Sequence, residues 1–280
     1  MSAFECKIPG KWVLTGEHTV LRGGTAIALP HPDFHLKLSF LPGPEGLKIE
    51  PAEATLVIQE ILDAARPHLA PGFLDSCTGT LKIQSTIPLG AGLGSSAALC
   101  VAVTRWLTHL GAKLPENPFE FAKRLEDHFH GKSSGMDIAV TSISKPILFK
   151  MDQPPEALGS KNLPRFTFHD TGLRTRTSGC VAKVEAFRSQ APQRGAEIDH
   201  LMMQATEQGL DGLRKFAEGQ TDAGLQDLAG AMRSGQKCFY DWDLVPKAAR
   251  ELEQKLLKEG ALAVKLTGAG GGGFLVALWG

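Results

Sequence analysis

The sequence predicts a globular protein of two lobes that combines β-strands with α-helices. Its 280 residues are 42% hydrophobic and 21% charged, which is enough apolar material for a sizeable core. Strand patterns recur through the first ninety residues, whereas helical spacing dominates beyond residue 178. The Pro154-Pro155 pair is the best linker signal. We therefore expect one domain over 1–152 and a second over 153–280.

Short alternating segments predict the strands of the first lobe. Strands are expected over 4–8 and 12–15, with a turn between them at Pro9-Gly10. A return strand over 25–29 should follow the Gly23-Gly24 turn. Alternation of apolar and polar residues predicts further half-buried strands over 35–40 and 81–87.

Helices are predicted from apolar spacing and from capping residues. A helix is expected over 52–66, where Pro67 ends it, and another over 97–110. Asn117 has the position of an N-cap, with proline next and Glu120 in the capping-box position, so a helix should run to about residue 130. The second lobe should hold helices and then a closing strand with a glycine turn; the helices are expected near 178–190, 196–217, 221–238 and 246–259.

Charge and cysteine content exclude several classes of protein. The 30 basic and 30 acidic residues cancel, so no global field attracts nucleic acid or an anionic membrane, and small molecules are the expected partners. Five scattered cysteines, with no Cys-x-x-Cys pair, favour reduced thiols in a cytoplasmic protein over a disulfide framework or a zinc site. No signal-peptide pattern and no apolar run long enough for a bilayer is present.

The strongest functional signal is the segment 88–99, which reads Pro-Leu-Gly-Ala-Gly-Leu-Gly-Ser-Ser-Ala-Ala-Leu. Glycines at every second position let peptide N–H groups approach an anion, and a helix starting near Ser95 would direct its positive dipole end at phosphates. The segment lacks the Lys-Ser or Lys-Thr ending of a common P-loop and the dinucleotide pattern. A tight structural connection remains the alternative to a nucleotide site.

A carboxylate falls on the apolar side of the helix after Asn117. Glu126 shares one face with Phe119, Ala122, Leu125 and Phe129. Because a bare buried carboxylate is costly, Glu126 is either paired with a basic side chain or ligates a cation such as Mg²⁺.

Phosphoryl transfer needs a phosphate-binding loop, a metal ligand, a positive charge and a group that acts on the acceptor hydroxyl. Two further residues are candidates for the last two of these roles. Asp137 follows the small residues of 131–135, and a simple helix N-cap is its alternative role. Lys11 would keep a neighbouring Asp137 ionised and neutralise phosphate charge, unless it is a solvated surface lysine.

A second glycine-rich segment lies near the end of the chain. Residues 268–273 contain five glycines in six positions between two apolar segments. Such a run costs backbone entropy, so it indicates a close approach to another loop or to a ligand rather than a plain hairpin.

Three segments together resemble the GHMP kinase superfamily, namely residues 9–18, 88–98 and 265–273. Within that superfamily, four segments are most similar to the mevalonate kinase family: Gly16-Glu17-His18-Thr19-Val20-Leu21, the glycine segment 90–98, residues 130–137 and residues 265–273. The resemblance implies a two-lobed α+β GHMP kinase fold, with an N-terminal ribosomal protein S5 domain 2-like lobe that binds ATP and a C-terminal ferredoxin-like α/β lobe. It also implies ATP- and Mg²⁺-dependent phosphorylation of the 5-hydroxyl of mevalonate, in isoprenoid biosynthesis, by a cytoplasmic homodimer.

The resemblance carries roles over to individual positions. Asp137 and Lys11 would act on the hydroxyl, and Ser96 and Glu126 would hold Mg²⁺. The phosphates of ATP would contact Pro88, Gly90, Ala91, Gly92, Leu93, Gly94, Ser95, Ser96 and Ala97. The acceptor would contact Lys11, Glu17, His18, Ser134, Gly135, Asp137, Thr177, Gly268, Ala269 and Gly270.

The sequence departs from the family at one position and leaves alternatives. Ser133 stands where mevalonate kinases usually carry proline, which is expected to loosen the loop that aims Asp137. Phosphomevalonate kinase is the second reading, for which Arg174 and Arg176 are the candidate groups for an extra phosphate. A related decarboxylase is a weaker reading, because those enzymes usually lack the Gly-Glu-His opening and the combination of Glu126 with Asp137. A non-catalytic homologue that binds ATP or a sugar is also a weaker reading, because Lys11, Ser96, Glu126 and Asp137 are all present.

Overall fold

The computed structural model describes residues 2–131, 133–159 and 162–280, and the chain forms two compact units. Unit 1 comprises 1–11, 30–88 and 94–144, and unit 2 comprises 12–29, 89–93 and 145–280. The chain therefore passes several times between the units, whereas the predicted division at residues 152 and 153 is a single cut. Each unit is described by itself below.

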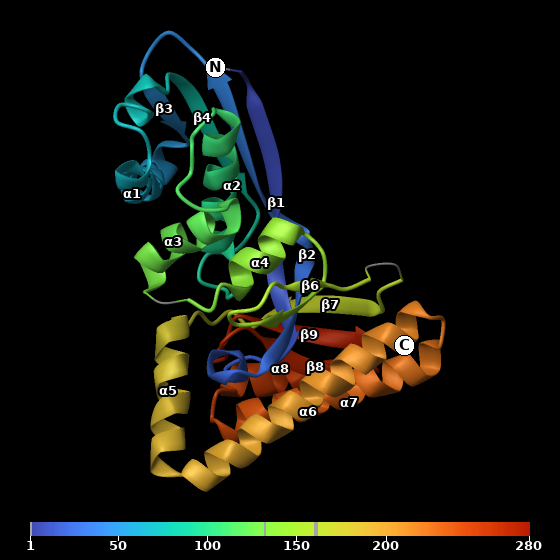
Figure 1. Ribbon diagram of the computed structural model, residues 1–280. Coiled ribbons are helices and arrows are strands. Elements are labelled where there is room, and N and C mark those ends of the chain that lie inside the picture. The colour runs from blue at the N-terminus through green and yellow to red at the C-terminus, as the bar shows by residue number, and fades with distance from the viewer. Residues whose placement is uncertain (1, 132, 160–161) are drawn as a thin grey trace. The chain divides into compact units, whose positions relative to one another are not determined.

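Unit 1 packs helices against an antiparallel pair of strands (Figure 1). The later part of β2 (Thr25–Pro42) pairs with β4 (Gly79–Ser85), from Leu36 opposite Ser85 to Pro42 opposite Gly79, and β3 (Leu47–Glu50) runs parallel to β4. Helix α2 packs against both α3 and α4. The helices of this unit are α1 (Thr55–Ala65), α2 (Ser95–His109), α3 (Pro118–His130) and α4 (Met136–Ile143).

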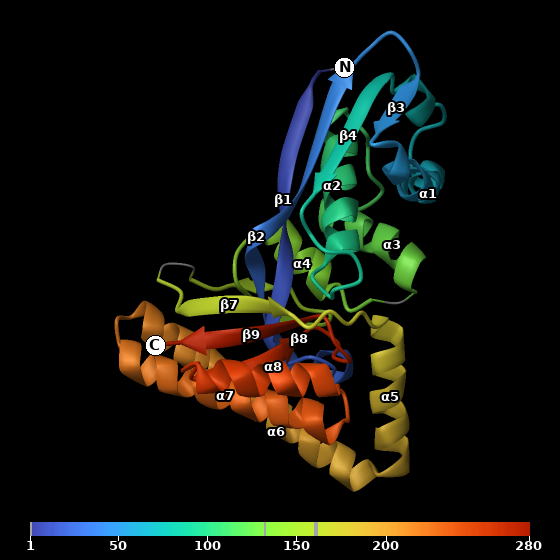
Figure 2. The same cartoon turned by 180° about the vertical axis from the view of Figure 1, so that it is seen from behind.

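Unit 2 contains a three-stranded antiparallel sheet in the order β7-β9-β8, covered by helices α7 and α8 in both views (Figure 1, Figure 2). Its core includes Phe239, Trp242, Leu266 and Leu275, all at most 1% exposed. Helices α6 and α7 pack along one another. The elements are β7 (Arg165–Asp170), α5 (Thr177–Gln190), α6 (Pro192–Ala217), α7 (Thr221–Asp241), α8 (Lys247–Lys258), β8 (Ala263–Thr267) and β9 (Phe274–Trp279).

Two strands are longer than the sequence predicts. Strand β1 (Phe4–Thr15) is continuous through Pro9-Gly10, so the predicted turn is wrong; β1 pairs with β2 alone among the described strands, and such an edge tolerates proline. Strand β2 likewise joins the expected strands 25–29 and 35–40. Its first residues pair with β5 (Ile147–Lys150), which in turn pairs with β6 (Glu156–Ala157), before β2 changes partner to β4.

The helix predictions are confirmed to within a few residues. Asn117 caps α3 by accepting a hydrogen bond from the backbone N–H of Glu120 at 3.0 Å. Short 3₁₀ turns, η2 (Ala52–Ala54) and η3 (Arg66–His68), flank α1, and η4 (Leu74–Ser76) precedes β4. The strands β3, β5, β6 and β7 were not predicted. β5 shows no alternation and β6 has only two residues, whereas β7 alternates polar and apolar residues and carried a strand signal that was missed.

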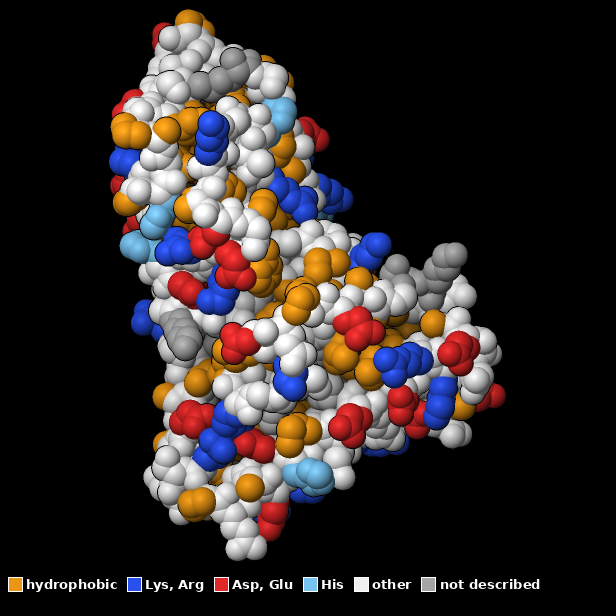
Figure 3. All heavy atoms as spheres, viewed as in Figure 1, with side chains coloured by type: hydrophobic (Ala, Val, Ile, Leu, Met, Phe, Trp, Pro, Cys, Tyr) orange, Lys and Arg blue, Asp and Glu red, His pale blue; other side chains and the backbone are white. Residues whose placement is uncertain are grey.

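The surface and the cysteines agree with the composition. Acidic and basic side chains are interspersed over the face seen in Figure 3. All five cysteines are free thiols in the structure. Over the described ranges, every helix is too short or too polar to cross a membrane.

Candidate active site

A buried lysine and an aspartate meet in unit 1. Lys11 lies on β1 and is 4% exposed, and its Nζ lies 3.1 Å from Oδ1 of Asp137 in the first turn of α4. The N-cap of α4 is Gly135, with φ of 83°, so Asp137 does not have the capping role. The predicted pair is therefore confirmed as a contact, and Lys11 is not a solvated surface residue.

The glycine segment ends at the start of α2, as expected. Gly90, Gly92 and Gly94 have φ of 67°, 74° and 73°, a region that favours glycine. A Cβ on Gly94 would lie 2.8 Å from Cγ of Lys11, so this glycine also makes room for the lysine stem. Ser95 and Ser96 are the first two residues of α2 and are half-buried. The positive end of the helix dipole thus lies beside Lys11 in unit 1.

Glu126 is the buried carboxylate that the helical spacing predicts. It is 4% exposed, and burial, followed by the charge of Asp137, raises its pKa to about 8. The nearby charge of Lys11 acts in the opposite direction. No described residue forms an ion pair with Glu126, and its Oε2 has no hydrogen-bond partner there. An unpaired buried oxygen beside a second carboxylate fits a divalent cation better than it fits the structural ion pair.

The residues present fit Mg²⁺ in particular. Within the described part of the chain, no cluster of three or more His, Cys, Asp or Glu side chains is placed to hold a metal, so a site built entirely from such ligands is not present there. Mg²⁺ usually takes one or two protein oxygens and completes its shell with water and substrate phosphates. Glu126 and the hydroxyl of Ser96 are oxygen donors of that kind in unit 1.

The loop that precedes Asp137 is tied down by Asp127. The backbone N–H of Ser133 donates to Oδ1 of Asp127 at 2.8 Å, a bond that proline at this position cannot make. Lys123 holds the other oxygen of Asp127 at 2.7 Å. The hydroxyl of Ser134 accepts from the N–H of Met136, the first residue of α4, at 3.2 Å. Ser133 therefore anchors the loop, contrary to the expected loosening.

A second group of predicted residues lies in unit 2, at the turn after β1. Glu17 is 4% exposed and forms an ion pair with Lys265, which is 1% exposed. The ammonium of Lys265 also donates to the carbonyl of Leu266 at 2.7 Å and lies 4.7 Å from the ring centroid of Phe239. Glu17 is thus engaged inside unit 2, an arrangement suited to holding the turn.

His18 belongs to the same turn and is kept neutral by its surroundings. It is 5% exposed, its Nε2 lies 2.9 Å from the carbonyl oxygen of Ala269, and the ring of Trp242 lies 5.1 Å away. Since a carbonyl only accepts, Nε2 carries the proton. Burial lowers the pKa of His18 to about 4.

The two glycine-rich segments approach each other inside unit 2. A Cβ on Gly273 would lie 2.8 Å from the carbonyl oxygen of Ala91, and one on Gly92 would lie 3.9 Å from Cα of Gly268. Gly268 and Gly270 have φ of 88° and 90°. The predicted close approach of the 268–273 run to another loop is therefore confirmed, with segment 89–93 as that loop.

Two other predicted residues lie on the surface of unit 2, and one ion-pair partner was not predicted. Thr177 is the first residue of α5 and is exposed. Arg174 forms a bidentate pair with Asp170, with both distances 2.7 Å. Sequence reasoning missed Lys265 as the partner of Glu17, although a lysine within an apolar strand was a signal of a buried charge.

Comparison with known proteins places both parts of the chain in one family. Residues 56–145 match the family model of the GHMP kinases N terminal domain, and residues 224–279 match that of the GHMP kinases C terminal. The mevalonate kinase of Aeropyrum pernix is 26% identical over 99% of this chain and 89% of its own length. That of Thermococcus sibiricus is 32% identical over 71% of this chain, an alignment that spans 59% of the relative.

A solved structure shows the same fold. The crystal structure of L. major mevalonate kinase in complex with R-mevalonate has a TM-score of 0.74 and covers 98% of this chain and 86% of its own. At 23% sequence identity, this likeness concerns the fold.

Proposed function

Because the chain belongs to the GHMP kinase family, we propose that it transfers the terminal phosphoryl group of ATP to the 5-hydroxyl of mevalonate. The observation that carries the proposal is the contact of buried Lys11 with half-buried Asp137 beside the glycine-capped start of α2. Phosphoryl transfer depends on positioning and on neutralising charge, and this arrangement supplies an acid, a cation and an anion-binding helix end.

We assign the chemical roles to unit 1. Asp137 accepts or orients the proton of the acceptor hydroxyl, and Lys11 keeps that carboxylate ionised and offsets charge on the phosphates. The backbone N–H groups of residues 94–97, at the start of α2, contact the phosphates. Ser96 and Glu126 would hold Mg²⁺, which when bound neutralises charge on the phosphate oxygens.

We assign acceptor recognition to the segments of unit 2. His18, Thr177 and residues 268–270 are the proposed contacts, whereas Glu17 acts through Lys265 by fixing the turn. A phosphorylated acceptor would need an additional cationic group, and Arg174 is already engaged by Asp170. The pairing of Arg174 leaves Arg176, the N-cap residue of α5, as the candidate group for a phosphorylated acceptor.

The direct test is ADP release with Mg²⁺ and ATP, with mevalonate, 5-phosphomevalonate, homoserine and galactose offered separately. We expect a response to mevalonate alone. A response only to 5-phosphomevalonate would replace the proposed acceptor, and no response to any of the four would refute the proposed kinase reaction with these substrates.

The role of Asp137 is tested in the same assay. Asp137→Asn should lower turnover about 100-fold or more and leave ATP binding nearly unchanged, because a positioned proton acceptor typically contributes that much. Asp63→Asn is the matched control, since Asp63 is another carboxylate of unit 1 whose side chain is 74% exposed. Full turnover of a folded Asp137→Asn variant would remove Asp137 from the reaction.

The family resemblance also underlies two further proposals, a homodimer and a cytoplasmic location. Five free thiols support a reducing compartment. Sedimentation velocity on the purified protein measures the oligomeric state directly.

A further inference from the structure

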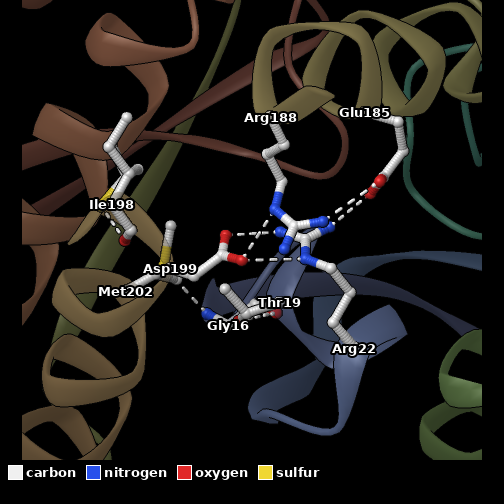
Figure 4. Close-up of polar contacts among 9 residues, drawn as sticks. Gly16, Thr19, Arg22, Glu185, Arg188, Ile198, Asp199 and Met202 are labelled. Atoms are coloured by element: carbon white, nitrogen blue, oxygen red, sulfur yellow. Dashed lines mark hydrogen bonds and ion pairs between the residues drawn. The ribbon is translucent and has the colours of Figure 1, made fainter. Parts of the chain in front are cut away.

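Four charged side chains of unit 2 form a closed network at the end of the turn that carries Glu17 and His18 (Figure 4). Arg22 is the last residue of η1 (Thr19–Arg22), Asp199 lies on α6, and Glu185 and Arg188 lie on α5. The Nε and Nη2 of Arg22 donate to Asp199 at 3.0 and 2.5 Å, and its Nη1 donates to Glu185 at 2.7 Å. Arg188 pairs with the same two acids at 3.0 and 3.2 Å.

The central pair of this network is shielded from solvent. The side chains of Arg22 and Asp199 are 17% and 13% exposed. Their two parallel contacts use the planar fork of guanidinium, which a lysine ammonium cannot reproduce. Two cations balance two anions, so loss of Arg22 would leave Asp199 with Arg188 as its remaining ion-pair partner here.

The turn that ends at Arg22 has an unfavourable backbone that needs anchoring. His18 has φ of 63°, a conformation that few residues other than glycine adopt. Gly16 has φ of 98°, and its N–H donates to the sulfur of Met202 on α6 at 3.3 Å. The turn is therefore held near its start by Gly16 and at its end by Arg22, with His18 between the two anchors.

The same network anchors α5, which begins at the proposed acceptor contact Thr177. Only Cys180 and Val184 are buried among the fourteen residues of α5. Few apolar contacts thus fix this helix, and the ion pairs of Glu185 and Arg188 add a polar attachment to the turn and to α6. A Cβ on Gly195 would lie 2.9 Å from Cγ of Arg188, so this glycine permits the close approach of α6 to α5.

We propose that Arg22 is a positioning residue for the acceptor, because it locks the turn bearing His18 and the helix bearing Thr177 to α6 through Asp199 and Glu185. The inference rests on the proposed function and adds to it a residue that touches neither substrate. Arg22 acts on the two segments of unit 2 and on none of the residues assigned to ATP within unit 1.

Steady-state kinetics separates this role from a general loss of structure. Arg22→Met should raise the KM for mevalonate about tenfold or more, with the KM for ATP within about twofold, because small misplacements of binding groups weaken productive contacts. Arg22→Lys should give a smaller rise, since it restores the charge without the fork. Should Arg22→Met fail to fold, Arg22→Lys and Asp199→Asn apply the same test.

Arg194→Met is the matched control. Arg194 lies on α6, is 49% exposed, and pairs with Glu197 and Asp241 at 3.0 and 2.9 Å. Arg194→Met removes ion pairs with two acids, as Arg22→Met does. Because the pairs of Arg194 are exposed and contact neither the turn nor α5, the KM values of this variant should equal those of the wild type.

Hydrogen exchange gives a readout that does not depend on activity. Amides of residues 17–24 and of the first turns of α5 should exchange faster in Arg22→Met than in Arg194→Met. Unchanged exchange, or equal changes in the KM for mevalonate and for ATP, would overturn the positioning role. If the wild type shows no activity with mevalonate, the proposed function fails, but the exchange result still decides whether Arg22 locks these segments. If the wild type phosphorylates another acceptor, the KM for that acceptor replaces the KM for mevalonate in the test.

Discussion

The buried neutral His18 should make the protein less stable in mild acid, and by an amount that the structure allows us to estimate. Its pKa is lowered from 6.5 to about 4, chiefly by burial. At pH values between these two pKa values, His18 is mostly protonated in the unfolded chain and mostly neutral in the folded protein. The site therefore leaves the free energy of unfolding unchanged above about pH 6.5 and lowers it as the pH falls from 6.5 towards 4.

The expected magnitude follows from linkage. At pH 7.5 the two states bind almost the same number of protons at this site, so the contribution to the free energy of unfolding is about zero. At pH 5 the unfolded state is favoured by about 2 kcal/mol, because each pKa unit corresponds to about 1.4 kcal/mol. Protonation of His18 in the folded protein would also place a buried charge near Lys265 and Arg22, whose charges lower its pKa further.

The assay is urea unfolding at pH 7.5 and pH 5 for the wild type and for His18→Asn. Asparagine does not titrate, and any change in stability that does not depend on pH cancels between the two pH values. His31, in unit 1, also has a pKa lowered to about 4, but it is present in both proteins and cancels in the comparison. The wild type should lose about 2 kcal/mol more than the variant between the two pH values. An equal loss in both proteins would refute the neutral, buried state of His18.

Gly235→Ala and Ser133→Pro test two contacts that hold residues of the candidate site in place. Gly235→Ala should lower the free energy of unfolding by about 1–3 kcal/mol, because the new Cβ would lie 2.9 Å from Cε of buried Lys265. Gly209→Ala is the control, since its Cβ would have its nearest contact at 3.4 Å, and it should be neutral or stabilising. Thermal unfolding measures both variants. Ser133→Pro removes the N–H that donates to Asp127, so stability should fall by about 1–2 kcal/mol and turnover should fall with it. A fully active Ser133→Pro protein of unchanged stability would show that this bond does not position the loop.

Local rules account for much of what the sequence predicts. The Asn117 cap with its following proline, the ends of α5 to α8 and the positive φ of Gly94 all depend on residues within a turn or two. The burial of Glu126 follows from helical spacing on a single helix. The error at Pro9-Gly10 arose because a proline within a strand is tolerated only when that strand lies at an edge, a property of the sheet and not of the segment.

The sequence by itself determined the motifs, the residue types suited to phosphoryl transfer and the family to which they point. Only the tertiary structure decided which of these residues meet: Lys11 with Asp137 in unit 1, and Glu17 with Lys265 in unit 2. It also decided that Asp127 anchors the loop before α4. The physical reason is that contacts between distant residues depend on how strands pair and helices pack, and neither is encoded in the spacing of neighbouring residues.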